Sequence, residues 1–80
     1  MAEVIKCALY DHFEMACIRR CEVLLELKDG ETISGIARDL KSKNSAEFLL
    51  LVTDDGEHRV NLMHIDVLVF SDSGERIIIS

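Results

Sequence analysis

The chain has 80 residues, three cysteines, no proline or tryptophan, and a formal net charge of −6. Its length allows one domain, expected over residues 1–80, whose core buries roughly 60% of the surface of the unfolded chain. An acidic chain lacks the positive surface that nucleic acid attracts, so we expect no direct contact with nucleic acid.

The start of the chain has no long apolar run of the kind found in secretion signals. No other segment approaches the roughly 20 apolar residues of a membrane span. Three cysteines cannot all pair within one chain, which agrees with a reducing compartment. We therefore expect a cytoplasmic protein without a membrane partner.

Residues 1–8 carry little pattern and are expected to be extended or frayed. A short helix is predicted from about His12 to Arg19, with Asp11 as its N-cap. Glu14, three residues after Asp11, would complete a capping-box-like pair.

The predicted helix is two-sided. Phe13, Ala16 and Cys17 share one side with Leu9, and this side would lie on a sheet. Tyr10, Asp11 and Glu14 would then gather on the outer side.

Residues 23–36 alternate between apolar and polar and predict two short strands around Asp29-Gly30. That dipeptide favours a type I′ hairpin turn. Gly35 lies inside the second strand, where a glycine usually marks a bulge or a sharp bend. A small sheet needs such a bend in order to curl.

The remaining chain predicts more short strands separated by polar turns. In order, we expect the second strand to reach about Leu40, an exposed loop at 41–45, a central strand covered on both faces at 47–53, a turn at 54–57, a strand at 58–62, a brief turn at 63–65, a strand at 66–70, a turn at 72–74 and a last strand at 76–79. The fold class is therefore mainly β with one N-terminal helix, as a small antiparallel barrel or curled sheet of five or six strands.

Metal and catalytic motifs are weak. The residues that could bind a metal are Cys7, Cys17, Cys21, His12, His58 and His64, but they show neither CxxC nor HxxxH spacing. Cys17 is as well explained by packing as a small apolar side chain. No motif marks a nucleophile and no glycine-rich phosphate loop is present, so we expect no enzyme and no cofactor.

The acidic side of the helix has two interpretations. Tyr10 beside Asp11 and Glu14 places an aromatic anchor next to carboxylates that could meet arginine or lysine of a partner. The alternative is a solvated helix face whose acidic residues cap the helix.

Two resemblances follow from these segments. The hairpin at 27–35 and the strand region at 61–70 resemble an Sm-like barrel. The chain more closely resembles the Rho-binding antiterminator family, known as Rof or YaeO. The segments that carry this likeness are the spacing of Cys7, Tyr10, Asp11, Glu14, Ala16 and Cys17, followed by Leu25 to Glu31, Asp39-Leu40 and Glu47-Phe48-Leu49.

The family resemblance implies a partner and a mechanism. Its members are small acidic bacterial proteins that bind the hexameric transcription termination factor Rho and reduce termination. It implies that Tyr10, Asp11 and Glu14 contact the RNA-binding region of Rho. A second contact is implied at the polar loop, through Lys43, Asn44 and Ser45. The chain, expected to be a monomer, would then block RNA loading by covering the basic surface.

Two other classes of function remain open. One is a ring-forming RNA-binding protein that resembles Hfq, against which the net charge of −6 counts. The other is a structural subunit whose free strand edge pairs with another chain.

Overall fold

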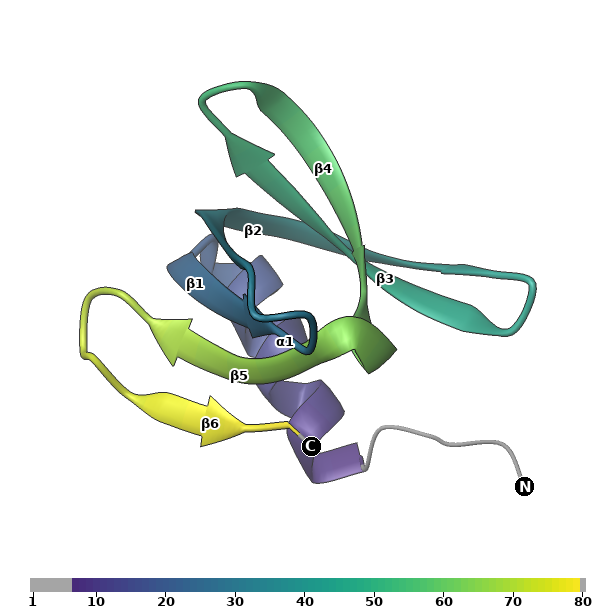
Figure 1. Cartoon of the computed structure of the whole chain (residues 1–80), viewed down its shortest axis with the longest axis horizontal. Helices are drawn as coiled ribbons and strands as arrows, with labels where there is room; N and C mark the ends of the chain where they lie inside the picture. Colours follow the sequence, from purple (N-terminus) through teal and green to yellow (C-terminus); the bar gives the residue numbers. More distant parts are fainter. Residues whose placement is uncertain (1–6, 80) are drawn as a thin grey trace.

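The computed structural model describes the backbone of residues 7–79 and the side chains of residues 10–79. One helix packs against a small sheet (Figure 1). In chain order the elements are α1 (Cys7–Arg19), β1 (Glu22–Leu27), β2 (Thr32–Lys43), β3 (Ala46–Thr53), β4 (Gly56–Asn61), the 3₁₀ turn η1 (Leu62–His64), β5 (Ile65–Phe70) and β6 (Arg76–Ile78). The prediction of a mainly β fold with one N-terminal helix is confirmed.

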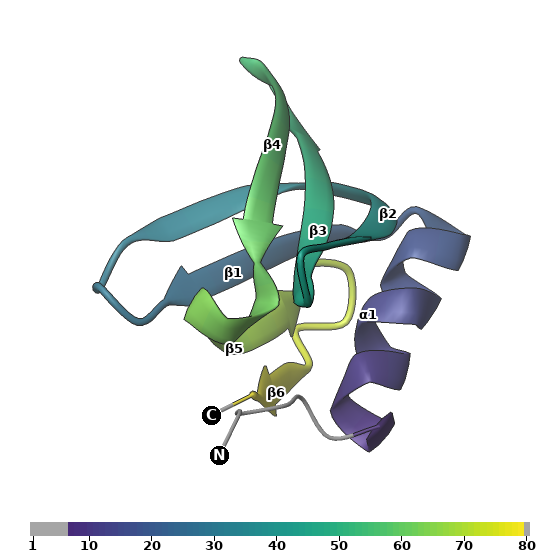
Figure 2. The ribbon, with the colours of Figure 1, turned by 90° about the vertical axis from the view of Figure 1, so that its right-hand side faces the viewer.

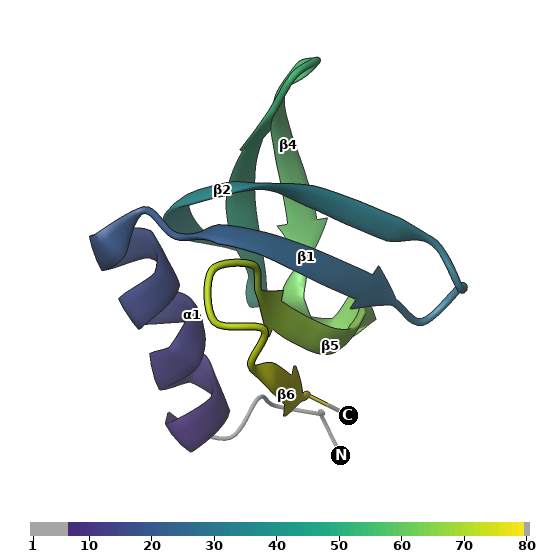
Figure 3. The ribbon, with the colours of Figure 1, turned by 90° about the vertical axis from the view of Figure 1, so that its left-hand side faces the viewer.

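The six strands form one sheet in the order β4-β3-β2-β1-β5-β6, and every neighbouring pair is antiparallel. β4 and β6 are its two edges, and the described residues of these strands do not pair with each other. The sheet is strongly curled, so β3 and β4 rise away from β5 and β6 (Figures 1 and 3). Of the two predicted forms, the structure has the curled sheet and not a closed barrel.

The bend of the sheet lies in β2, which is 12 residues long. Its first part pairs with β1 and its second part with β3, with Ile36 shared between them. A Cβ on Gly35 would lie 2.5 Å from the carbonyl oxygen of Val52, so β3 can approach this closely only at a glycine. A β-bulge between Ala37 and Asp39 adds to the bend. The bend predicted from Gly35 is confirmed.

The core lies between α1 and the curled sheet. Phe13 and Ala16 of α1 are fully buried, which confirms the predicted sheet-facing side of the helix, and Cys17 packs against them half-buried. The sheet contributes apolar side chains from every strand, namely Val23, Leu25, Ala37, Leu49, Leu51, Val60, Ile65, Leu68 and Ile77. Among residues 10–79, none of the charged or polar residues is buried.

The start of α1 differs from the prediction. The helix begins at Cys7, so Asp11 lies inside it and is not its N-cap. Glu14 consequently has no capping box to complete, and the first turn of α1 has no acidic residue. The extra turn is stabilised by docking, because Tyr10 packs against the core. Residues 1–6 lie outside the described part of the chain, whereas Cys7 and Ala8, predicted as extended or frayed, are helical.

The end of α1 agrees with the prediction, since Arg19 lies in the last turn. Arg20 follows in the left-handed region with φ 51°. The N–H of Cys21 donates to the carbonyl of Ala16 at 2.9 Å, and the N–H of Arg20 to that of Cys17 at 3.2 Å. This is a Schellman motif, in which Arg20 occupies the position that glycine usually takes.

The turns of both hairpins that flank the bend differ from the predicted turns. In the first, Gly30 has φ 91° while Asp29 is not left-handed, and the N–H of Leu27 donates to the carbonyl of Glu31. The loop is therefore a three-residue turn with a glycine bulge, and the predicted type I′ turn is wrong. In the second, β2 continues to Lys43, and only Asn44 and Ser45 form the turn, with φ 52° and 66°. The predicted exposed loop at 41–45 is thus a tight hairpin.

β3 is not the doubly covered strand that its apolar sequence predicted. It lies next to the edge strand β4, and only Leu49 and Leu51 are fully buried, while Phe48, Leu50 and Val52 are half-exposed. The later elements follow the predicted order of turn, strand, brief turn and strand, with boundaries shifted by one or two residues.

Candidate protein-binding site

The predicted helix residues meet the β2–β3 hairpin at one side of the molecule. We call this surface the α1 corner and define it as Tyr10, Asp11 and Glu14 of α1 with Ser42 and Glu47 of the hairpin. Figure 2 shows α1 standing beside this hairpin, which points toward the viewer.

Glu47 holds the α1 corner together. The hydroxyl of Tyr10 donates a hydrogen bond to Glu47 Oε2 at 3.2 Å, across 37 positions of sequence. The hydroxyl of Ser42 donates to the same oxygen at 2.7 Å, and Ser42 and Glu47 are direct cross-strand partners. One carboxylate oxygen therefore ties the helix to both strands of the hairpin.

Tyr10 lies partly in the core and partly in this acidic surface. The side chain is half-buried and packs against the core cluster, so it is not on the outer side of α1 as predicted. Burial raises the pKa of its hydroxyl, and the charge of Glu47, the hydrogen bond to Glu47 and the charge of Glu14 raise that pKa further. The phenol stays protonated at neutral pH and donates a hydrogen bond.

Asp11 and Glu14 point to solvent from the interior of the helix, as predicted for the outer side. Within residues 10–79, no ion pair involves Asp11, Glu14 or Glu47. Met15 is 44% exposed and Ile18 is 74% exposed on the same helix. Helical spacing places Asp11, Met15 and Ile18 in one stripe, so the carboxylates border exposed apolar side chains.

Lys43, Asn44 and Ser45 form the exposed tip of the β2–β3 hairpin. Ser45 is two positions before Glu47, so the turn is short and directly connected to the anchored part of β3. No hydrogen bond or ion pair within residues 10–79 joins the side chains of this tip to Tyr10, Asp11 or Glu14, and the polar connection runs through Glu47 and Ser42.

Among residues 10–79, the histidines and cysteines considered for metal binding do not form a metal-holding group. Within the described side chains, no group of three or more His, Cys, Asp or Glu residues has the geometry to hold a metal ion. Cys17 and Cys21 are free thiols, and the side chain of Cys7 lies outside the described part. Burial, with Asp39 and Glu14 nearby, raises the pKa of Cys17 to about 11, so this thiol is protonated at neutral pH.

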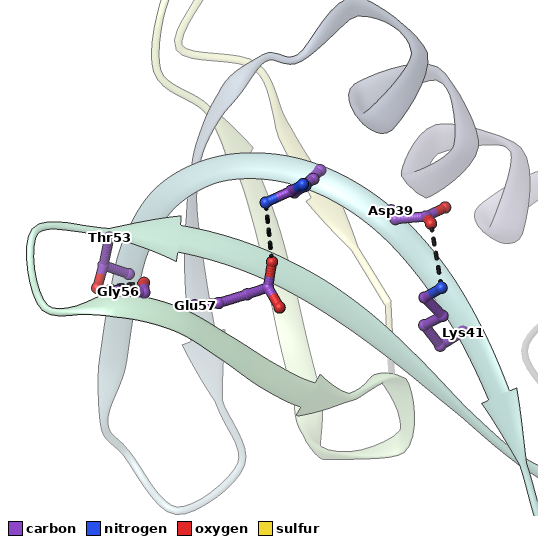
Figure 4. A network of polar contacts seen from close by, with 6 residues as sticks. Asp39, Lys41, Thr53, Gly56 and Glu57 are labelled. Atoms are coloured by element: carbon purple, nitrogen blue, oxygen red, sulfur yellow. Dashed lines mark hydrogen bonds and ion pairs between the residues drawn. The ribbon is translucent and has the colours of Figure 1, made fainter.

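A hollow on the outer face of β2, β3 and β4, which we call the outer groove, shares Ser42 with the α1 corner and Lys43 with the hairpin tip. Side chains alternate along β3, so Leu50 points away from the face that buries Leu49 and Leu51. Leu50 lines a shallow groove of about 630 Å³ together with Lys41, Ser42, Lys43, Glu57, His58 and Arg59. Two ion pairs border it, Arg38 with Glu57 at 3.1 Å and Lys41 with Asp39 at 3.6 Å (Figure 4).

Glu47 is the site residue that sequence reasoning missed. It was part of an apolar strand pattern and of the Glu47-Phe48-Leu49 segment of the family resemblance, and neither gave it a role at the site. Only its distant partner Tyr10 gives it a role. The cross-strand position opposite Ser42 depends on where the β2–β3 hairpin turns, which the sequence placed too early.

The geometry defines a class: a small β protein with one docked helix, which presents an acidic and apolar surface at the α1 corner and has no metal-holding cluster among its described residues. The family model described as "Modulator of Rho-dependent transcription termination (ROF)" matches residues 4–77. The chain therefore belongs to this family of modulators of Rho-dependent transcription termination.

Individual relatives agree with this assignment. "Protein rof" from Escherichia coli (strain K12) and "Protein rof" from Shigella flexneri are each 43% identical over 47 residues, which cover 59% of this chain. The match spans only 56% of either relative. The solved structure "YaeO bound to Magnesium from Vibrio cholerae O395" has a TM-score of 0.71 and 24% identity, and the likeness covers 76% of this chain and 80% of that one. It supports the fold.

No helix of the described part is long and apolar enough to cross a membrane.

Proposed function

We propose that the chain binds the termination factor Rho through the α1 corner and inhibits Rho-dependent termination by blocking RNA loading, as a monomer in the cytoplasm. The family description supports a role in Rho-dependent termination. An RNA-binding surface must be basic, and this acidic surface complements it in charge.

The observation that carries the proposal is the position of Asp11 in α1. Because the helix begins at Cys7, Asp11 and Glu14 do not cap it. Aspartate inside a helix costs roughly 0.5 kcal/mol or more relative to alanine. No described cation pairs with either carboxylate. The capping explanation is therefore removed, and a binding role explains why these charges lie there.

The surroundings of these two carboxylates fit an interface. Tyr10 is a rigid aromatic side chain whose hydroxyl is already hydrogen-bonded, which lowers the entropy lost on binding. Met15 and Ile18 supply exposed apolar area beside the charges. Lys43, Asn44 and Ser45 would form a second contact from the hairpin tip. Tyrosine and methionine are both enriched at protein interfaces relative to the rest of the surface.

The proposal is tested by competition for Rho. A fluorescent single-stranded RNA bound to purified Rho hexamer is titrated with the protein, and the RNA-dependent ATPase is followed in parallel. Displacement of the RNA with a matching loss of ATPase activity is expected. Rho that binds the protein and retains its RNA would contradict the loading mechanism, and Rho that does not bind the protein would contradict the proposal as a whole.

A second candidate function is RNA binding by the chain itself, and the outer groove favours it. Lys41, Lys43 and Arg59 line this groove, and the Arg59 guanidinium lies 5.7 Å from the centre of the Phe48 ring. Cations with an aromatic ring are typical of single-strand binding surfaces. A gel-shift assay with single-stranded RNA and no Rho separates the two functions, because only the second predicts a shifted band.

A further inference from the structure

The most unusual polar group of the α1 corner is the carboxylate of Glu47. It is half-buried, it has no cationic partner among the described residues, and it accepts hydrogen bonds from Tyr10 and Ser42. A partly desolvated carboxylate costs free energy unless its partners compensate for it. Its two donors come from two different elements, Tyr10 from α1 and Ser42 from β2.

We propose that Glu47 is a positioning residue for Rho binding: it fixes Tyr10 of α1 and the β2–β3 hairpin in one arrangement, so that both contact surfaces meet the partner without rearrangement. This inference rests on the proposed function of the α1 corner. Glu47 acts through Tyr10 and through the hairpin, and it need not touch Rho itself.

The geometry gives this role a physical basis. Tyr10 and Asp11 are consecutive, so holding the phenol limits the motion of the helix turn that carries Asp11. Ser45 is two positions before Glu47, so the same anchor limits the motion of the hairpin tip. Ordering a rotamer-rich side chain on binding weakens affinity by about 3- to 10-fold, and an anchor already in place avoids this loss.

The chain offers a direct reporter of the anchor, since Tyr10 is its only tyrosine and tryptophan is absent. The ionisation of Tyr10 can be followed by absorbance near 295 nm without another chromophore of that kind. Glu47 contributes to the raised pKa of Tyr10 through its charge and its hydrogen bond. Loss of the carboxylate therefore lowers this pKa, in the absence of Rho.

The experiment combines this titration with Rho affinity in a double-mutant cycle of Glu47→Ala and Tyr10→Phe, with circular dichroism as a folding control. Glu47→Ala is expected to lower the pKa of Tyr10 and to weaken Rho binding about 3- to 10-fold. In the Tyr10→Phe background, the hydrogen bond is already absent, so Glu47→Ala is expected to have a clearly smaller effect.

Two further variants separate positioning from direct contact. Glu47→Gln keeps an oxygen acceptor for Tyr10 and removes the charge, so it is expected to bind Rho more tightly than Glu47→Ala. It also keeps the fold testable if the alanine variant is unstable. Ser42→Ala removes only the second donor to Glu47, and it is expected to change the pKa of Tyr10 less than Glu47→Ala does.

Three outcomes would overturn the inference. The first is unchanged Rho affinity in Glu47→Ala although the pKa of Tyr10 falls. The second is an equal effect of Glu47→Ala with and without the Tyr10 hydroxyl. The third is equal weakening by Gln and Ala, which indicates a direct charge contact. Failure of the proposed function itself is distinct, because wild-type protein would then not displace RNA from Rho.

Discussion

Two exposed acidic surfaces of this molecule differ in why their charges are there. The turn between β3 and β4 carries Asp54 and Asp55, and the α1 corner carries Asp11 and Glu14. Aspartate is a preferred turn residue, and the N–H of Asp55 bonds to the hydroxyl of Thr53, so local chemistry explains the first pair. Helix propensity disfavours Asp11, and no cap or described ion pair compensates.

The two surfaces are also supported differently. The β3–β4 turn projects from the end of a two-stranded arm, far from α1 (Figures 1 and 2). The α1 corner lies over the core, and its Tyr10 packs against the core and donates a hydrogen bond to Glu47. Charge alone therefore does not identify an interface. A charge that its local structure does not explain, on an ordered surface, is the better indicator.

Charge reversal is the strongest way to break this comparison. Asp11→Lys with Glu14→Lys is expected to weaken Rho binding by about 100-fold or more, because two attractive contacts become repulsive. Asp54→Lys with Asp55→Lys changes the net charge by the same amount and is the matched control. It is expected to reduce affinity by only a few-fold, through weaker long-range attraction. Affinity is measured by biolayer interferometry with circular dichroism on each variant.

Equal losses in both double variants would show that net charge and not the α1 corner decides binding. Unchanged affinity in the helix variant would remove the proposed site.

Gly35→Ala tests the bend that places the two surfaces apart. Its Cβ would lie 2.5 Å from the carbonyl oxygen of Val52, so β2 or β3 must move. We expect the free energy of unfolding to fall by about 3 kcal/mol, measured by urea denaturation. Ser34→Ala, at the exposed neighbouring position, is the control and should change it by less than about 0.5 kcal/mol. A mild effect at Gly35 would mean that the strands separate easily.

The pH dependence of stability tests the buried, acidic environment of the Cys17 thiol on α1. Burial and the carboxylates of Asp39 and Glu14 raise the pKa of Cys17 from 9.0 to about 11 in the folded chain. The folded state then holds this proton more tightly than the unfolded state, so the stabilisation is complete below pH 9 and is lost as the pH rises toward 11. In Cys17→Ala, the loss of unfolding free energy between pH 9 and pH 11 is expected to be smaller by on the order of 1 kcal/mol. The effect is no larger because solvent screens a half-exposed site. If the unfolding free energies of the wild type and of Cys17→Ala change in parallel with pH, this environment for Cys17 is contradicted.

The sequence predicted the parts of the fold that depend on local periodicity. Helical spacing identified Phe13 and Ala16 as the buried side of α1, and the glycine in β2 identified the bend. The helix prediction succeeded because burial on one face imposes a period that the residues must follow. The bend prediction succeeded because only a glycine leaves room for the close approach of β3.

What the sequence could not predict depends on contacts between distant segments or on competing local signals. Asp11 and Glu14 match a capping box in sequence, yet the helix begins before them at Cys7, with Tyr10 packed against the core. Asp29-Gly30 suits a type I′ turn and also a glycine bulge, so the dipeptide does not choose between them. The Tyr10–Glu47 bond spans 37 positions and has no sequence signal.

Amide hydrogen exchange of the chain with and without Rho tests the central claim most directly. We expect slower exchange in α1 and at the tip of the β2–β3 hairpin when Rho is bound, with β6 and the turn between β3 and β4 unchanged. Protection confined to β4, with α1 and the tip of the β2–β3 hairpin exchanging as in the free protein, would place Rho elsewhere on the sheet and contradict the proposed site.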